Sequence, residues 1–177
     1  MAGPLPHYDT TFVGREALCE RVLAGLARPG LLTLLGPGGV GKTRLAVETC
    51  GRLRRRGAVF VDLADARSRS DLAEAVLAAA GRLSGAEGPE AAVGDWLGRQ
   101  DVVLVLDNGE QLAADAAQAV VRWRAEAPDT RVLVTSRRPL DVPDEQVLPV
   151  PPLELAPAVD LFLSRIPAGL AADVAPH

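Results

Sequence analysis

Residues 31–46 read LLTLLGPGGVGKTRLA, and this segment restricts the fold more than any other part of the sequence. An apolar run that ends at a glycine is typical of a parallel strand covered on both faces. Beyond the glycines, Leu45, Thr49 and Leu53 share one face of a predicted helix. The spacing GxxxxGKT at residues 36–43 matches the phosphate-binding loop, or P-loop. We therefore expect a strand, a phosphate-binding loop and a helix in direct succession.

The rest of the chain alternates apolar runs with helical periodicity. Further candidate strands are 58–63, 102–107, 132–136 and a weaker one at 146–150. One helical face joins Leu112, Ala116, Val120, Trp123 and Ala127. Strands that alternate with helices imply right-handed crossovers and a parallel sheet. The expected fold class is therefore α/β, a three-layer P-loop sandwich around a five-stranded parallel sheet.

Local signals predict where some of the helices begin and end. Asp71 followed by Glu74 indicates a helix over 71–83. Gly57 and Pro128 occupy positions where helices should end. After two prolines, residues 156–165 predict a last short helix.

Composition excludes several classes of protein. A chain of 177 residues that is 48% hydrophobic can bury one substantial core. Its net charge of −4 argues against direct DNA binding by this fragment. No apolar run is long enough for a membrane span and no secretory signal is evident, so we expect a cytoplasmic protein without membrane contact. Cys19 and Cys50 lie in no metal-binding pattern and are expected to be buried thiols.

The loop itself carries the first candidate site. Glycines at positions 38, 39 and 41 permit positive φ angles and a close approach of main-chain N–H groups to phosphate. Lys42 is the only lysine among the 19 Lys and Arg residues, and a compact ammonium suits the β and γ phosphates of a nucleotide. Thr43 would offer its hydroxyl to Mg²⁺. The predicted nucleotide contacts are Gly36, Pro37, Gly38, Gly39, Val40, Gly41, Lys42, Thr43 and Arg44. The alternative is a glycine-rich turn with an exposed lysine.

A second acidic site is predicted where the run VVLVLDNGE ends a buried strand, which is a Walker B pattern. Asp107 would hold Mg²⁺ through a water, and Glu110 could orient the attacking water. A simple strand-ending turn remains the alternative for Asp107, and a solvated carboxylate in a first helical turn remains the alternative for Glu110. Together with Lys42, these residues and Arg137 form the predicted catalytic set.

The strand at 132–136 ends in TSRR, and polar residues at the carboxyl end of a central strand lie where ligands bind in open α/β sheets. Arg137 could sense the γ phosphate, and Thr135 or Ser136 could contact phosphate or its water. Arg138 is the weaker candidate. A plain loop arginine is the alternative for Arg137.

The ordered set FVGRE, LLTLLGPGGVGKTRLA, VVLVLDNGEQL, VLVTSRRPL and VLPVPPLELAPAVDLFLSR resembles the STAND class of signal-transduction ATPases, close to the NB-ARC and NACHT groups. It is most similar to the bacterial branch found in transcriptional regulators of the SARP and LuxR types. The resemblance implies an ATP/ADP switch, with Val13, Gly14 and Arg15 beside the adenine. It also implies an ASCE-type sheet of order 5-1-4-3-2 and a sensor role for Arg137. The chain departs from the NB-ARC pattern at Asn108, where a second Walker B acid is common, and lacks the winged-helix histidine.

Three segments are expected. These are a flexible N-terminal stretch (1–10), the P-loop domain (11–155) and the start of a truncated helical subdomain (156–177). The resemblance implies partner helical and winged-helix domains beyond this fragment and nucleotide-dependent self-association of the parent. A Ras-type GTPase is excluded because its base-reading motif needs a second lysine. Two alternatives stay open, namely an autonomous P-loop ATPase enzyme and a non-hydrolysing interaction module with a vestigial loop.

Overall fold

The computed structural model describes residues 5–53 and 56–165, in which helices and strands alternate along most of the chain. The elements are α1 (Glu16–Leu26), β1 (Gly30–Leu35), α2 (Lys42–Gly51), β2 (Gly57–Asp62), α3 (Arg69–Ala79), α4 (Pro89–Leu97), β3 (Val102–Asp107), the 3-10 helix η1 (Gly109–Leu112), α5 (Ala113–Glu126), β4 (Arg131–Ser136), β5 (Glu145–Pro149) and α6 (Leu155–Leu163). Each predicted strand is present, with its ends shifted by at most one residue.

The five strands form one parallel sheet in the order β2-β3-β4-β1-β5. Read from the other edge, this is the predicted order 5-1-4-3-2, so the fold class is confirmed. Strand β4 lies between β1 and β3. The carboxyl ends of the P-loop strand and of the Asp107 strand are therefore separated by one strand only.

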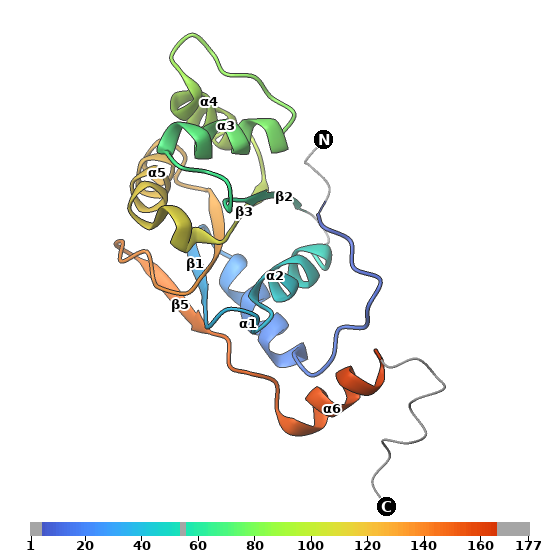
Figure 1. Cartoon of the computed structure of the whole chain (residues 1–177). Coiled ribbons are helices and arrows are strands. Elements are labelled where there is room, and N and C mark those ends of the chain that lie inside the picture. The colour runs from blue at the N-terminus through green and yellow to red at the C-terminus, as the bar shows by residue number, and fades with distance from the viewer. Residues whose placement is uncertain (1–4, 54–55, 166–177) are drawn as a thin grey trace, which may run out of the picture.

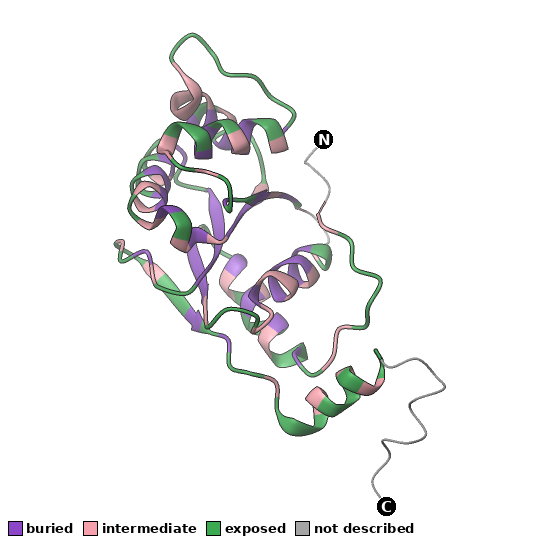
Figure 2. Cartoon of the chain, viewed as in Figure 1, coloured by how far each residue is buried: buried purple, intermediate pink, exposed green. Residues whose placement is uncertain are grey.

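Helices cover both faces of the sheet (Figure 1). Val103 and Val105 of β3 point into a core that α1 and α2 close. Leu104 and Leu106 of the same strand point into the opposite core, which α3, α4 and α5 close. Because side chains alternate along a strand, an uninterrupted apolar run fills both cores. Figure 2 shows the buried strands between the two helical layers.

Three predicted helix boundaries were wrong. Helix α3 begins at Arg69 and not at Asp71, because Ser68 is its N-cap and accepts a hydrogen bond from Asp71 N at 3.1 Å. It ends at Ala79, short of the predicted residue 83, and Gly81 follows with a φ of 66°. Gly57 does not end a helix, since α2 stops at Gly51 and Gly57 opens β2.

The two ends of the described chain lie on the α1–α2 side of the molecule (Figure 1). Leu5 packs against the core formed with α1 and α2. The predicted last helix is present as α6 and exposes Leu155, Val159 and Phe162. Residues 1–4 of the predicted flexible segment and residues 166–177 of the predicted subdomain lie outside the described residues.

The two cysteines are buried free thiols, as predicted. Thr49 Oγ1 donates to Cys19 Sγ at 3.5 Å, and burial raises the pKa of Cys50 to about 12. Within residues 5–53 and 56–165, no helix combines the length and apolarity that crossing a bilayer would require.

Trp123 holds α5 against α4 and generates the first prediction. Its side chain is fully buried, and its indole N–H donates to the carbonyl of Glu90 at 3.1 Å. Trp123→Ala removes this packing and leaves a cavity, so we expect a loss of about 3–5 kcal/mol in the free energy of unfolding, measured by chemical denaturation. Trp96→Ala is the control, because Trp96 is only partly buried. Equal losses for the two variants would contradict the role given to Trp123.

Candidate nucleotide-binding site

The P-loop joins the carboxyl end of β1 to the first turn of α2. Gly39 and Gly41 have φ angles of 74° and 92°, in the left-handed region that favours glycine. Gly38, the third glycine expected to permit a positive φ, does not adopt one, but it lies close to Arg137. A Cβ atom at Gly38 would lie 3.1 Å from Arg137 Nη2, so a larger residue would displace that guanidinium from the loop.

Lys42 lies folded over the loop and is 9% exposed. Its ammonium donates to the carbonyls of Gly36 at 2.9 Å and Pro37 at 3.0 Å. Burial lowers the pKa of Lys42, with a smaller contribution from Arg137, while Glu110 and Asp107 act in the opposite direction. The ammonium is thus a partly desolvated positive charge that two carboxylates help to retain.

Asp107 and Thr43 are in direct contact. Thr43 Oγ1 donates to Asp107 Oδ1 at 2.8 Å, and Thr135 Oγ1 donates to the same oxygen at 2.5 Å. Asp107 is only 4% exposed, and its burial raises its pKa against the effect of these two hydroxyls. The strand order explains the arrangement, since β4 delivers Thr135 between the other two. The structure therefore brings both predicted metal ligands together and places the Thr135 hydroxyl in contact with Asp107.

Glu110 and Arg137 form an ion pair beside the loop. Arg137 Nε lies 3.0 Å from Glu110 Oε1, and the main-chain N–H of Arg137 donates to Glu110 Oε2 at 3.3 Å. The Glu110 side chain is 14% exposed and that of Arg137 is 63% exposed. Arg137 therefore reaches from solvent to Gly38, whereas the neighbouring Ser136 is buried and its hydroxyl accepts from Arg138 N.

A pocket of about 460 Å³ lies next to the P-loop. Its lining combines residues 11–13, Arg15, the loop residues 37–41 and Arg44 with Pro152, Leu153, Leu161 and Arg165. Val13 and Arg15, two of the residues expected beside the adenine, line this pocket. Gly14 does not, because it lies under α6, where a Cβ atom would be 2.4 Å from Pro157 Cβ. Sequence reasoning missed the contribution of α6, since no local pattern in residues 155–165 indicates what that helix covers.

Arg15 is a buried cation aimed at the loop. Only 6% of the residue is exposed, and its Nη2 donates to the Pro151 carbonyl at 3.0 Å. Its other terminal nitrogen, Nη1, is buried without a hydrogen-bond partner among the described residues. That nitrogen lies 3.4 Å from the position of a Cβ atom on Gly41. Burial lowers the pKa of Arg15.

Arg44 connects the helix after the loop to the N-terminal segment. Its guanidinium lies 4.4 Å from the centre of the Tyr8 ring, bonds to the carbonyl of Thr10 and pairs with Glu48 at 2.7 Å. Residues 8–10 are thereby held against α2. Arg44 also lines the pocket; these contacts occupy its two terminal nitrogens, while its Nε is buried without a hydrogen-bond partner among the described residues.

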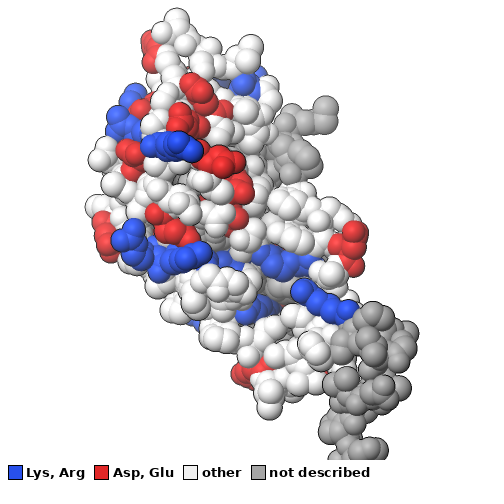
Figure 3. All heavy atoms as spheres, in the orientation of Figure 1, with Lys and Arg blue, Asp and Glu red and all other residues white. Residues whose placement is uncertain are grey.

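Charged side chains are unevenly distributed on one face of the molecule. Figure 3 shows Lys and Arg side chains gathered in a band across the middle of one face, with most of the Asp and Glu side chains above it.

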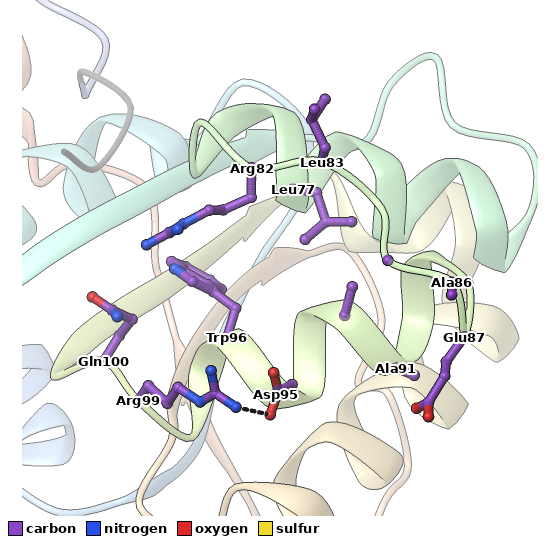
Figure 4. Close-up of a pocket in the computed structure, with 13 residues that line it drawn as sticks. Leu77, Arg82, Leu83, Ala86, Glu87, Ala91, Asp95, Trp96, Arg99 and Gln100 are labelled. Atoms are coloured by element: carbon purple, nitrogen blue, oxygen red, sulfur yellow. Dashed lines mark hydrogen bonds and ion pairs between the residues drawn. The ribbon is translucent and has the colours of Figure 1, made fainter.

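A second pocket, of about 560 Å³, lies between the end of α3 and α4. Figure 4 shows it lined by Arg82, Trp96 and the Asp95–Arg99 ion pair. None of the predicted site residues lines this second pocket.

Comparison with known sequences gives a family and several relatives. The AAA domain family matches residues 26–137, more than half of the chain. A Mycobacterium tuberculosis protein, named provisionally as an HTH-type transcriptional regulator, is 36% identical over 144 residues, which are 79% of this chain and 16% of that protein. An uncharacterized Mycobacterium bovis protein is 32% identical over 162 residues, or 88% of this chain and 41% of that protein. The chain thus spans less than half of the length of these relatives.

Solved structures agree on the fold. A STAND protein with a tetratricopeptide repeat sensor from Pyrococcus horikoshii superposes with a TM-score of 0.55 at 14% identity, covering 95% of this chain and 27% of that one. The ORC2 protein of Aeropyrum pernix, solved in ADPNP and ADP complexes, gives a TM-score of 0.57 at 13% identity, covering 84% of this chain and 50% of that one. The resemblance to STAND-type P-loop ATPases that the motifs predict is confirmed. By its sequence match and its fold, the chain belongs to the AAA domain family.

Proposed function

We propose that this chain is the nucleotide-binding domain of a larger regulatory protein, in which bound ATP or ADP together with Mg²⁺ sets the conformational state. Membership of the AAA domain family supports nucleotide binding. The relative named provisionally as a transcriptional regulator is much longer than this chain and supports a regulatory setting. The alternative of an autonomous P-loop ATPase enzyme has no comparable support.

One observation carries the proposal. The hydroxyl of Thr43 lies 2.8 Å from the carboxylate of Asp107, directly beside the loop that holds the Lys42 ammonium. An ammonium suits phosphate, and a hydroxyl next to a carboxylate suits a hard divalent cation. This combination at a helix N-terminus is what binding a nucleoside triphosphate requires.

Thr43 and Asp107 fit Mg²⁺ by the chemistry of their oxygens. Mg²⁺ in nucleotide sites is usually held by one or two carboxylates together with phosphate oxygens and water. The described residues contain no cluster of three or more His, Cys, Asp and Glu side chains. When bound, Mg²⁺ would neutralise charge on the phosphates. The role of the chain is to hold the Thr43 hydroxyl and the Asp107 carboxylate at one point, and Thr135 fixes Asp107 there.

The pocket beside the loop is the proposed base site. Its lining is partly apolar, through Phe12, Val13, Leu153 and Leu161, and its charged members are arginines. An apolar slot with cationic edges suits a purine base joined to phosphates. Arg15 is placed to contact the phosphates. Its Nη1 faces the loop, has no hydrogen-bond partner among the described residues, and would gain one from a phosphate oxygen.

Helix α6 couples the pocket to the rest of the parent protein. Leu161 of α6 and Arg165, just beyond its end, line the pocket, while Leu155, Val159 and Phe162 are exposed. An apolar helix surface of this kind is suited to packing against another domain. We therefore retain the proposed division into an N-terminal segment, a core of residues 11–155 and a helical subdomain that begins at residue 156. A nucleotide that contacts core and α6 together would favour one arrangement of the two.

Hydrolysis is proposed to be slow. Glu110 is the residue best placed to orient a water, yet both of its carboxylate oxygens contact Arg137. A carboxylate held in this way is a poor base until Arg137 turns away. Such a site would keep the bound nucleotide for a long time, which suits a switch.

Nucleotide binding is tested through Lys42. We expect Mg·ADP at about 100 times its Kd to raise the Tm of the wild-type chain by 5 °C or more, because a ligand at this excess stabilises the folded state by about 2.7 kcal/mol. Lys42→Met keeps the apolar stem and removes the charge, and should abolish most of this rise. Arg28→Ala removes an exposed charge elsewhere and should leave it unchanged. A wild-type chain whose Tm does not respond to millimolar Mg·ADP would refute the proposed binding.

Arg137 is predicted to distinguish ATP from ADP. Its guanidinium lies beside Gly38 of the P-loop, where we expect it to contact the γ phosphate of ATP. ADP lacks this phosphate and would not make the contact. Arg137→Ala should weaken binding of a non-hydrolysable ATP analogue by about tenfold and change ADP binding by less than about threefold, as measured by titration calorimetry. Arg138→Ala is the matched control. Equal losses for both nucleotides would show that Arg137 does not read the γ phosphate.

The rate of turnover separates the switch from the autonomous enzyme. We expect steady-state ATP hydrolysis by the isolated chain at about 0.01 s⁻¹ or slower, in the range of unassisted nucleotide switches. A rate of about 1 s⁻¹ or more that disappears in Lys42→Met would instead favour an enzyme complete without its neighbours. A phosphate-release assay gives the rate directly.

A further inference from the structure

A second acidic strand end lies beside Asp107. Asp62 is the last residue of β2, and it pairs in register with Asp107, the last residue of the neighbouring strand β3. Its side chain is exposed, and neither the P-loop motif nor the Walker B pattern includes it. A second carboxylate beside Asp107 is unfavourable on its own, because the two negative charges repel each other. A stabilising contact is needed to offset this repulsion.

Asn108 supplies this stabilising contact. The side-chain amide of Asn108 donates to Asp62 Oδ1 at 2.8 Å, and the same nitrogen lies 3.4 Å from Asp107 Oδ2. Its main-chain N–H donates to Thr135 Oγ1 at 3.1 Å, the hydroxyl that in turn donates to Asp107. Asn108 therefore bridges the two carboxylates with its side chain and contacts the Thr135 hydroxyl with its backbone.

The backbone of Asn108 needs this support. It has a φ of 60° and a ψ of 41°, the left-handed conformation that is unfavourable for residues other than glycine and that Asn adopts more readily than most. The conformation turns the chain directly from Asp107 into η1, which carries Glu110. Whatever holds Asn108 in place therefore fixes the direction of both the Asp107 and the Glu110 side chains.

We propose that Asp62 is a positioning residue for the metal site, acting through the side-chain amide of Asn108 to hold Asp107 and the turn after it. The proposal rests on the proposed Mg·nucleotide function. It assigns the second acidic residue of this site to the neighbouring strand, where its carboxylate reaches the site through an amide.

A purely local role for Asp62 makes a different prediction. Asp62 Oδ1 also accepts from the main-chain N–H of Ala64 at 2.9 Å, which closes the turn after β2. If this were its only role, removal of the carboxylate would lower stability without changing metal binding. A measurement of metal affinity thus separates the two roles, and a measurement of stability alone does not.

The test uses Mn²⁺ in place of Mg²⁺, with its binding to the protein·ADP complex followed by electron paramagnetic resonance. Asp62→Ala removes the acceptor, and Asp62→Asn keeps an oxygen that can accept from Asn108. Asn108→Gly removes the amide and tolerates the left-handed backbone. Asp65→Ala is the control, because Asp65 is an exposed carboxylate three residues further along the same segment. ADP affinity without metal reports on the P-loop alone.

We expect Asp62→Ala and Asn108→Gly each to weaken Mn²⁺ affinity by about tenfold, as loss of a residue behind a metal ligand does. The double variant should be no weaker than either single one, because the two residues act in series. Asp62→Asn should stay within about threefold of wild type, and ADP affinity without metal should not change.

Mn²⁺ affinity in Asp62→Ala equal to that in Asp65→Ala would overturn the positioning role, as would losses that add in the double variant. If Asp62→Ala does not fold, an unchanged Mn²⁺ affinity in Asn108→Gly would overturn it equally. In these cases metal-dependent ADP binding by the wild-type chain leaves the proposed function intact. Absence of that binding in the wild-type chain would overturn both proposals.

Discussion

The contact between Thr43 and Asp107 is the constraint on which the rest of the site depends. These residues are 64 positions apart in the chain, and they meet at 2.8 Å because β4 lies between β1 and β3. In a sheet of another order, the end of β3 would lie further from the first turn of α2. The inserted strand also supplies Thr135, whose hydroxyl bonds to the same carboxylate oxygen. The strand order thus matters here less for the core than for bringing three side chains to one point.

The site concentrates charge that the protein alone does not neutralise. Burial lowers the pKa of Lys42 and Arg15 and raises that of Asp107, so each of these groups is less stable as an ion than it would be in water. A buried charge is costly unless it is paired, and Arg15 keeps an unpaired buried nitrogen. Under the proposed function, an anionic ligand with a divalent cation relieves both kinds of cost. Binding energy of this origin can be used to shift a conformational equilibrium, because it is available only when the site is filled.

The sequence predicts those features that depend on short segments. Strand ends, the P-loop and the buried face of α5 follow from apolar runs and spacing within about ten residues, and all of them are present. It could not predict the contacts of Asp62, the pairing of Glu110 with Arg137 or the cover of α6 over Gly14, because each joins residues brought together only by the fold. The error at α3 has a local cause: Ser68 competes with Asp71 as the cap, and only the backbone shows which one accepts the hydrogen bond.

Both ends of the described chain converge on the same pocket, and this has a consequence for how a switch could operate. Residues 11–13 and Arg15 form one wall, while Leu161 of α6 and Arg165 after it form another. Pro157 packs on Gly14, and Arg15 bonds to the Pro151 carbonyl, so the two walls already touch each other. A nucleotide bound between them would contact segments about 150 residues apart in sequence but attached to one rigid sheet. A nucleotide whose base binds in this pocket would therefore act on α6 directly, without having to pass through the core.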